Sequence, residues 1–416
     1  MERWINNNKL TSWMVFLSLA LLLATPGVSV AAFAILLLVG VLFMFRVKNK
    51  PELTFTDKLL IVTLLFIFLT VLPPFVSDGF RGRYLDLTLR YLLAIPVLLL
   101  LLNTPPKAGW LFGGANVGAV GALLLALYQY FYLGMSRVDG FLYSINFGYL
   151  ACALAFLCLP GIWFFDNNLK RAFSLVGFVS ALIAMLLTGT KGAYIAVPPL
   201  LAIMLFIYRK EIGGKLLLAC LAATVSLPVA SYVAIPQVEQ RFHVLISDIV
   251  NYESANQEAA YTSAGLRLEL WKAAISAFKQ SPVYGLNYNQ REALNADLVE
   301  EGIVIPQVLT VSRGHAHSEY FEALAGRGAL GLMALLMLFL VPGVIFLRKA
   351  VQSEGQTKAL AVTGVAFVGG FMIYGISEAP LQGNVMSSCY ALTVVAIYAM
   401  LRRPEESGIT AGERVP

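Results

Sequence analysis

Charged side chains are scarce in this chain of 416 residues. They make up 13% of it, against 58% for hydrophobic residues, and the mean hydropathy is +0.75. Soluble globular domains carry about 25% charged residues, so a fold that is soluble throughout is excluded. Cysteines are also few, and all four fall in long apolar runs (Cys152, Cys158, Cys220 and Cys389). We interpret them as buried packing residues, which leaves no disulfide to brace a polar segment.

Several catalytic signatures are missing as well. The sequence has no glycine-rich phosphate loop ending in Lys-Ser or Lys-Thr, no Gly-x-Ser-x-Gly elbow and no cysteine-rich zinc pattern. These absences exclude the P-loop, α/β-hydrolase and zinc-finger classes of site. The net charge of +6 requires no nucleic-acid partner, because the basic residues gather between apolar runs, where they would lie at a membrane surface.

What the sequence does contain is a series of apolar runs, each long enough to cross a hydrocarbon core of about 30 Å as a helix. Backbone groups in lipid must be satisfied within the segment, so helices are expected. We predict an all-α integral membrane protein with about 12 transmembrane helices. The predicted spans are 12–28, 29–46, 57–76, 86–104, 109–134, 144–165, 170–188, 192–208, 215–235, 328–347, 358–376 and 385–401.

The basic residues predict the orientation of these spans, since cytoplasmic connections are enriched in Lys and Arg. Every connection on one side of the predicted bundle carries at least one. Both termini are therefore expected in the cytoplasm, and the long segment between spans 9 and 10 outside it. The predicted organisation is spans 1–9 in 1–235, a partly helical periplasmic segment in 236–327, spans 10–12 in 328–402 and a cytoplasmic tail in 403–416.

Polar residues concentrate on the predicted outer face. They occur in the turn 77–83, which runs on to Arg90, and in the turns 137–148, 188–192 and 377–380. These turns hold more polarity than a connection needs. A site assembled from them would lie at the outer membrane interface, and its basic candidates are Arg81, Arg83, Arg90 and Lys191.

The long outer segment contains one clear amphipathic pattern. Apolar residues recur at helical spacing from 265 to 280, Thr262 or Ser263 is placed to cap the start, and Ser281-Pro282 ends the helix. Arg267 and Trp271 stand four residues apart, so the guanidinium is expected to lie against the indole. The alternative is an ordinary surface arginine on an amphipathic helix.

A second piece of this segment, 313–324, holds two of the three histidines. Ser318 is a plausible cap for a helix leading into the next span, which would place His317 at the positive end of that helix. There the dipole disfavours the imidazolium, and a neutral histidine can act as a general base. Two other interpretations stay open: His315, His317 and Glu319 as metal ligands, although a third well-spaced ligand is missing, or two histidines that only cap or solvate a loop.

Taken together, these residues resemble the O-antigen ligase and polymerase superfamily, which are membrane glycosyltransferases of the GT-C type. Leu187 to Ala193 is similar to the family's Thr-Gly-Ser-Arg-Gly turn, and Gly140 to Gly148 to its Gly-then-Asn-x-Phe-Gly segment. Further matches are an Arg-x-x-x-Trp helix, a Pro-x-x-Gly turn and a His-Asn-x-Tyr-Leu motif, which resemble Arg267–Trp271, Pro282–Gly285 and His317–Phe321.

The resemblance implies transfer of a glycan from an undecaprenyl-pyrophosphate donor to a sugar hydroxyl of a lipid A–core oligosaccharide acceptor. This would take place at the periplasmic face of a bacterial inner membrane, with inversion and without metal, nucleotide or other cofactor. It implies His317 as the general base and Arg267 and Lys191 as the cations on the diphosphate. Lys191 departs from the family's arginine and lacks its bidentate fork. The remaining substrate-binding candidates are Arg81, Arg83, Arg90, His315, Glu319, Tyr320, Trp271 and Asn146.

Two points stay open within this interpretation. The residue that orients His317 could be Glu319, Glu322 or His315, and the sequence does not choose among them. The acceptor could instead be another repeat unit, as in an O-antigen polymerase, or a protein, as in a protein O-oligosaccharyltransferase. From a different class, a transporter or flippase would have as many spans but would place charged residues near the membrane midplane.

Overall fold

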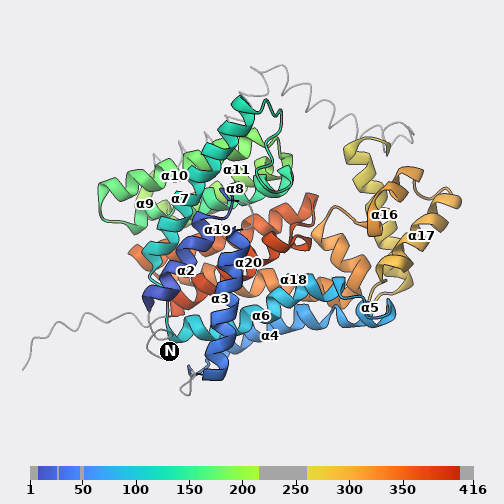
Figure 1. The fold of residues 1–416 in the computed structure, drawn as a ribbon, viewed down its shortest axis with the longest axis horizontal. Helices are drawn as coiled ribbons and strands as arrows, with labels where there is room; N and C mark the ends of the chain where they lie inside the picture. Colours follow the sequence, from blue (N-terminus) through green and yellow to red (C-terminus); the bar gives the residue numbers. More distant parts are fainter. Residues whose placement is uncertain (1–7, 26–27, 47–50, 215–259, 403–416) are drawn as a thin grey trace, which may run out of the picture.

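The structure is a computed structural model, and it describes residues 8–25, 28–46, 51–214 and 260–402 (Figure 1). These residues form helices and turns, with no strand among them. The predicted all-α membrane fold is confirmed. The helices of the first half are α2 (Asn8–Ala20), α3 (Val28–Arg46), α4 (Phe55–Leu69), α5 (Leu72–Ser77), α6 (Arg83–Asn103), α7 (Ala108–Leu127), η1 (Tyr128–Tyr132), α8 (Ser144–Cys158), α9 (Gly161–Phe164), α10 (Asn168–Leu187), α11 (Lys191–Ile207) and α12 (Arg209–Ile212).

The second half begins with the two helices of the polar segment and ends with three long apolar helices. They are α16 (Ser263–Gln280), α17 (Tyr288–Glu300), η2 (Pro306–Thr310), η3 (Ser312–Gly314), α18 (Glu319–Gln352), α19 (Gly355–Ser377), η4 (Pro380–Gln382) and α20 (Asn384–Arg402). Within the described residues, 8 helical stretches are long and apolar enough to cross a membrane, and α11 is a shorter apolar helix. The predicted span 215–235, Cys220 and both predicted cytoplasmic termini lie outside the described residues.

The span predicted at 12–28 differs most from the structure, since α2 runs from Asn8 to Ala20. The span predicted at 57–76 is found as one candidate membrane span, Phe55–Ser77, in which α4 and α5 meet just before Pro73 and Pro74. The helix predicted after Ser318 and the span predicted from 328 are both found, joined as α18, which begins at Glu319. A kink at Gly328 (φ 63°, ψ −155°) marks the predicted boundary, so the apolar span and the polar turn before it form one bent helix.

The basic connections gather at one end of the bundle. Asp57 at the start of α4 receives a hydrogen bond from Tyr398 (2.6 Å) and pairs with Arg402 (3.4 Å), so this start lies beside the end of α20. Lys358 at the start of α19 pairs with Glu211 in α12 (2.5 Å). The polar turn at 137–148 leads into α8, the turn at 188–192 joins α10 to α11, and the turn at 377–380 follows the end of α19.

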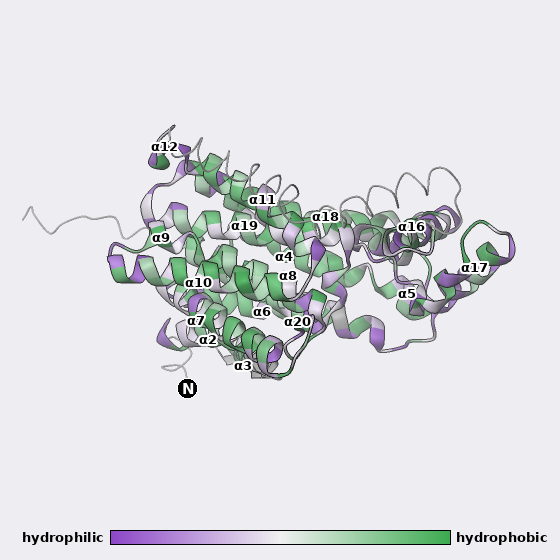
Figure 2. Cartoon of the chain, turned by 90° about the horizontal axis from the view of Figure 1, so that it is seen from above, coloured by the Kyte–Doolittle hydropathy of each residue, from purple (hydrophilic) through white to green (hydrophobic). Residues whose placement is uncertain are grey.

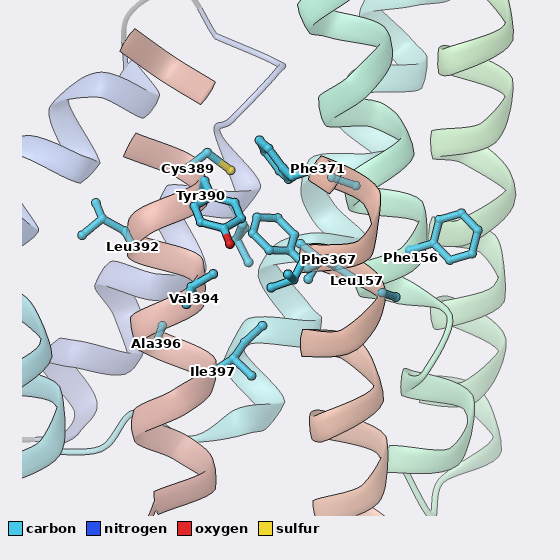
Figure 3. Packing of buried hydrophobic residues seen from close by; sticks show 14 of the residues in the cluster. Phe156, Leu157, Phe367, Phe371, Cys389, Tyr390, Leu392, Val394, Ala396 and Ile397 are labelled. Carbon is cyan, nitrogen blue, oxygen red and sulfur yellow. The ribbon is translucent and has the colours of Figure 1, made fainter. Parts of the chain in front are cut away.

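The core of the bundle is aromatic and tightly packed. Tyr390 of α20 lies 5.0 Å from Phe371 and 6.0 Å from Phe367 of α19, ring centroid to ring centroid (Figure 3). Its hydroxyl donates to the carbonyl of Leu338 in α18 (2.8 Å), which satisfies the one polar atom that this ring buries. Cys389, the neighbour of Tyr390 in sequence, is buried, and so are Cys152 and Cys158 in α8. Packing roles therefore fit the three described cysteines.

The polar helices α16 and α17 lie beyond one end of the apolar bundle (Figures 1 and 2). They are fixed to α18 through two glycines with left-handed backbone, Gly285 (φ 70°) and Gly328 (φ 63°). A Cβ at Gly285 would lie 2.3 Å from the backbone nitrogen of Arg327, and one at Gly328 would lie 2.4 Å from the carbonyl carbon of Val283. The amide of Leu286 donates to the carbonyl of Ala325 (2.8 Å). The Pro-x-x-Gly turn is thus the point at which the segment carrying α16 and α17 packs against the bent helix α18.

Candidate active site

Two histidines share one carboxylate at the start of α18. Nδ1 of His317 lies 3.0 and 3.1 Å from the two carboxylate oxygens of Glu378, and Nε2 of His315 lies 3.0 Å from one of them. Glu378 follows the last residue of α19, 61 positions after His317. No hydrogen-bond partner of the His317 Nε2 is found among the described residues, and the His317 side chain is 32% exposed. The imidazole is therefore held at one nitrogen and open at the other.

The hydrogen bonds of this cluster stabilise the charged forms of Glu378 and His315. Burial alone would raise the pKa of Glu378, but hydrogen bonds from His315 and His317 outweigh it and hold that pKa far below its usual value of 4.5. Burial alone would lower the pKa of His315, but hydrogen bonds to Glu322 and Glu378 raise it from 6.5 to about 10. At neutral pH Glu378 is therefore a carboxylate, which accepts only, and Nδ1 of His317 must carry the proton that it donates.

A buried ion pair supports the loop that carries both histidines. Arg291 of α17 pairs with Glu322 of α18 through two contacts of 2.6 and 3.0 Å, and it also donates to the carbonyl of Gly314. The second oxygen of Glu322 accepts the amide of Ala316 (2.9 Å) and lies 3.5 Å from Nδ1 of His315. Glu322 therefore orients His315 and the loop backbone, whereas the carboxylate on His317 is Glu378.

The backbone of this loop is in a strained conformation. Arg313 and His317 both have left-handed φ values, 60° and 46°, although neither is a glycine. Such residues cost about 1–3 kcal/mol each and persist only where the surroundings impose them, as they do at functional sites. Here the surroundings include the Arg291–Glu322 pair and the indole of Trp271, which donates to the carbonyl of Ala316 (3.0 Å). The loop is held in place from two sides.

Arg267 lies next to the carboxylate turn. Thr262 caps α16, as predicted, by accepting the amide of Gly265 (3.1 Å). One turn later the Arg267 Nε donates to the carbonyl of Ser377 (3.2 Å), the residue before Glu378, and Nη1 donates to Ser263. The expected stacking of Arg267 on Trp271 does not occur, because the indole stacks on Phe321 at 4.8 Å instead. No carboxylate pairs with Arg267 among the described residues, so its charge is available.

Lys191 precedes a glycine that packs against the same turn. Gly192, which follows it, packs so closely that a Cβ there would lie 2.5 Å from the hydroxyl of Ser377 and 2.4 Å from that of Tyr149. Those two hydroxyls are 3.2 Å apart. The Lys191 side chain is exposed at the start of α11 and has no ion-pair partner among residues the structure describes. Lys191, Arg267 and His317 therefore all lie around residues 377–378.

The two glycine motifs of the resemblance form one packed unit beneath Lys191. The carbonyl of Thr188 accepts Nε of Arg137 (3.0 Å), and the hydroxyl of Thr190 donates to the carbonyl of Ser144 (3.0 Å). Gly148 leaves no room for a side chain, since a Cβ there would lie 2.5 Å from the Thr190 hydroxyl. The segment 137–148 therefore fixes the turn that presents Lys191.

The three arginines near 77–90 occupy a neighbouring position and are partly neutralised. Arg83 and Arg81 surround the buried Asp78 at 3.0 and 3.8 Å, and Arg90 pairs with Asp86 (3.2 Å). Burial favours the neutral form of Asp78, but hydrogen bonds from Tyr84 and Arg83 hold its pKa below the usual value. Asp78 also accepts Nδ2 of Asn289 (2.6 Å). These contacts join the turn to α17.

Other candidate site residues form hydrogen bonds to backbone groups of the protein. Glu319 is buried and accepts the amide of Leu381 (2.8 Å), facing away from the histidines, and the hydroxyl of Tyr320 donates to the carbonyl of Met372 (2.8 Å). Ser318 occupies the cap position of α18, but its hydroxyl donates to the carbonyl of Gly375 (3.0 Å) and makes no cap bond. Asn146, at the start of α8, lines a separate cleft beside this turn.

His315, His317 and Glu378 are also the residues that could hold a metal, since one ligand atom from each lies within 4.8 Å of the others. The third ligand is not Glu319, as the sequence suggested, because that carboxylate points to Leu381. An imidazolium has no free lone pair, so the raised pKa of His315 (about 10) opposes coordination at neutral pH. The two imidazoles and the carboxylate are therefore better suited to hydrogen bonding with one another than to binding a cation.

Sequence reasoning did not single out Glu378, Arg291 or Arg313. The signal for Glu378 was the polar turn at 377–380, which was recognised as part of the outer face but not as the partner of His317. Arg291 lies in a helix whose charged residues have the usual composition of a solvated surface, and nothing local distinguishes it. Its burial (2% exposed) becomes visible only when α17 is packed on α18.

Comparison with known proteins agrees with the motifs. Residues 176–336 match the family model described as O-Antigen ligase. An uncharacterized protein of Haemophilus influenzae is 28% identical over 356 residues, which cover 84% of this chain and 88% of that protein. The matched region contains Lys191, Arg267 and His317. It implies glycosyl transfer of the O-antigen ligase or polymerase type by a membrane-bound enzyme. Over residues 176–336, the chain is therefore similar to the O-antigen ligase family.

Proposed function

We propose that this protein transfers an O-antigen glycan from undecaprenyl-pyrophosphate to a sugar hydroxyl of lipid A–core oligosaccharide, at the periplasmic face of the bacterial inner membrane. The observation that carries the proposal is the His317–Glu378 pair, in which Nε2 of His317 has no partner among the described residues. An imidazole fixed by a carboxylate at one nitrogen is a general base at the other. Arg267, bonded to the residue before Glu378, supplies positive charge beside that base.

The proposed reaction is a single inverting displacement. Nε2 of His317 takes the proton of the acceptor hydroxyl as the oxygen attacks the anomeric carbon. The bond from that carbon to the diphosphate oxygen breaks, and the diphosphate leaves with the electron pair. Glu378 keeps Nδ1 protonated throughout, so the imidazolium that forms is stabilised by a carboxylate at 3.0 Å. The proton then passes to solvent, since His317 is about one third exposed.

The leaving group needs compensation for its growing charge. A cation about 4 Å from a phosphate oxygen contributes about 4 kcal/mol at an effective dielectric near 20. Arg267 and Lys191 lie beside the same turn without carboxylate partners in the described part of the chain. Charges placed in advance cost no reorganisation when the reaction occurs. No metal is required in this scheme.

The experiment that tests the proposal is transfer in vitro. Purified protein would be given undecaprenyl-pyrophosphate glycan and lipid A–core, with and without EDTA. We expect product in both, because His315 is protonated and Glu378 is already bonded to two imidazoles. Loss of product on chelation, and its recovery with one divalent cation, would replace the general-base scheme by a metal scheme. Product formed only with a second donor glycan or with a protein as acceptor would indicate a polymerase or a protein O-oligosaccharyltransferase.

Arg267 gives a second test. Arg267→Ala is expected to lower kcat about 10²-fold, the usual loss for one preorganised charge on a leaving oxyanion. Arg267→Lys keeps the charge but loses the Nε donor to the Ser377 carbonyl, so it should recover part of the rate. The measurement is kcat for transfer with both substrates saturating. Equal rates for wild type and Arg267→Ala would remove Arg267 from the leaving-group role.

A further inference from the structure

A polar cleft lies beside the candidate active site and is not used by the mechanism above. It has a volume of about 420 Å³. Its polar lining comes from five separate parts of the chain: α6, the start of α8, η3, η4 and the start of α20. The side chains are Arg83, Asp86, Asn146, Arg313, Gln382 and Asn384. A hollow of this size holds one or two sugar rings.

The cleft has an excess of positive charge. Arg313 forms no ion pair with any described residue, and its guanidinium lies over the ring of Tyr288 at 5.6 Å. Arg83 lies over the same ring at 4.7 Å. Its pairing with Asp78 leaves its buried Nε without a hydrogen-bond partner in the part of the chain that the structure describes. Two guanidinium groups thus lie over one aromatic ring at the edge of the cleft. Arg83 is already paired with Asp78, so the positive charge left for an anion to compensate is mainly that of Arg313.

The remaining groups suit sugar hydroxyls. Asp86 accepts Nδ2 of Asn384 (3.2 Å) and keeps acceptor capacity, while Asn146 and Gln382 present amides that both donate and accept. A hydroxyl needs this combination because it donates one hydrogen bond and accepts others. Charged and neutral groups together therefore match a saccharide that carries an acidic substituent.

The cleft is separate from the proposed leaving-group cations, since neither Arg267 nor Lys191 lines it. Arg267 contacts Ser377, before Glu378, whereas Gln382 lies four residues after Glu378 in η4. Arg313 likewise lies four residues before His317 in the strained loop. An inverting displacement requires the nucleophile and the leaving group on opposite faces of the anomeric carbon. With the diphosphate at Arg267, a cleft that neither Arg267 nor Lys191 lines is available to the acceptor.

We propose that this cleft binds an anionic saccharide unit of the acceptor, bearing phosphate or carboxylate, and that Arg313 and Arg83 pair with the anionic group. This inference rests on the proposed function and names the acceptor subsite within it. Arg313 thereby sets the position of the acceptor chain relative to His317, which explains why the strained left-handed residue at this position carries a long cationic side chain.

The test compares acceptors and variants in the in vitro transfer assay. One acceptor is intact lipid A–core, a second has had its core phosphates removed, and a third has had its carboxylates reduced to alcohols. We expect the acceptor KM to rise at least about tenfold for whichever treatment removes the bound group, the usual loss for a charged hydrogen bond. Equal acceptor KM values for all three acceptors would overturn the proposal.

The variants are Arg313→Gln and Arg313→Lys, with Arg348→Gln as the matched control. Arg348 is an exposed arginine near the far end of α18. Arg313→Gln should raise the acceptor KM about tenfold for the intact acceptor and not for the treated one, with donor KM and kcat unchanged. Arg313→Lys should recover most of the affinity, and Arg348→Gln should match wild type. A change in donor KM alone would place the cleft on the donor side and refute the acceptor assignment.

These outcomes are separable from failure of the proposed function. If wild-type protein forms no product with any acceptor, the ligase assignment itself fails. If wild type transfers glycan efficiently while neither acceptor treatment nor Arg313→Gln changes the acceptor KM, the ligase assignment stands and only the cleft assignment is lost.

Discussion

Replacement of His317 by alanine is expected to lower glycan transfer by about 10³–10⁴-fold, while the protein still inserts in the membrane. General acid–base groups contribute about 10²–10⁴-fold, and here the base is also the group that aligns the acceptor hydroxyl. Nothing in the described residues can replace it: His315 is held as an imidazolium with a pKa of about 10, and Glu378 has its pKa held far below its usual value. The measurement is single-turnover transfer with saturating donor and acceptor.

The backbone at His317 calls for a matched variant. Its φ of 46° is left-handed, a conformation that asparagine tolerates better than alanine does. His317→Asn therefore relieves the backbone cost while still lacking a base of suitable strength. Both variants should lose transfer equally, and thermal unfolding of His317→Asn in detergent should stay close to that of wild type. If either variant transfers glycan at the wild-type rate, His317 is not the base.

The helical membrane fold could be predicted from the sequence because its determinants are local. A run of about 20 apolar residues specifies a span by itself, and the ends of α6, α10, α19 and α20 fall within a few residues of the predicted ones. The helix start after Ser318 was likewise predicted from local sequence, and α18 begins at Glu319. Helix capping at Thr262 was likewise local, and it was correct.

The partners within the site could not be predicted in the same way. Glu319, Glu322 and His315 were the candidate orienting groups because they lie two to five residues from His317, yet the carboxylate on its Nδ1 comes from 61 residues away. Neither glutamate bonds to His317 despite its proximity in sequence, because successive side chains at a helix start point in different directions. Glu319 turns to Leu381 and Glu322 to Arg291. Only the packing of α18 on α19 selects Glu378.

Glu378→Gln is the variant that isolates this orienting carboxylate, and it should lower kcat about 10³-fold with little change in either KM. The amide keeps the size of the side chain and one oxygen acceptor. The new amide can also donate to Nδ1, which would favour the tautomer that carries its proton on Nε2. In that tautomer Nε2 cannot take the proton of the acceptor hydroxyl. The corresponding carboxylate-to-amide change in a serine protease triad costs about 10⁴-fold for this reason. Loss of kcat with unchanged KM separates a positioning role from a general loss of binding.

Glu378→Gln should also destabilise the fold in a pH-dependent way. Because the folded-state pKa of Glu378 lies below its usual value of 4.5, the carboxylate contributes stability that is fully present above about pH 4.5 and is lost as pH falls through the lowered pKa. Wild type should therefore unfold at a higher temperature than Glu378→Gln at pH 7, and the difference should shrink under strongly acidic conditions. Glu378→Asp keeps the charge on a shorter side chain and should retain that stability at pH 7 while transferring more slowly than wild type. If Glu378→Gln were as active as wild type, the carboxylate would serve only to hold the His315–His317 loop, and the tautomer of His317 would have to be set by another group.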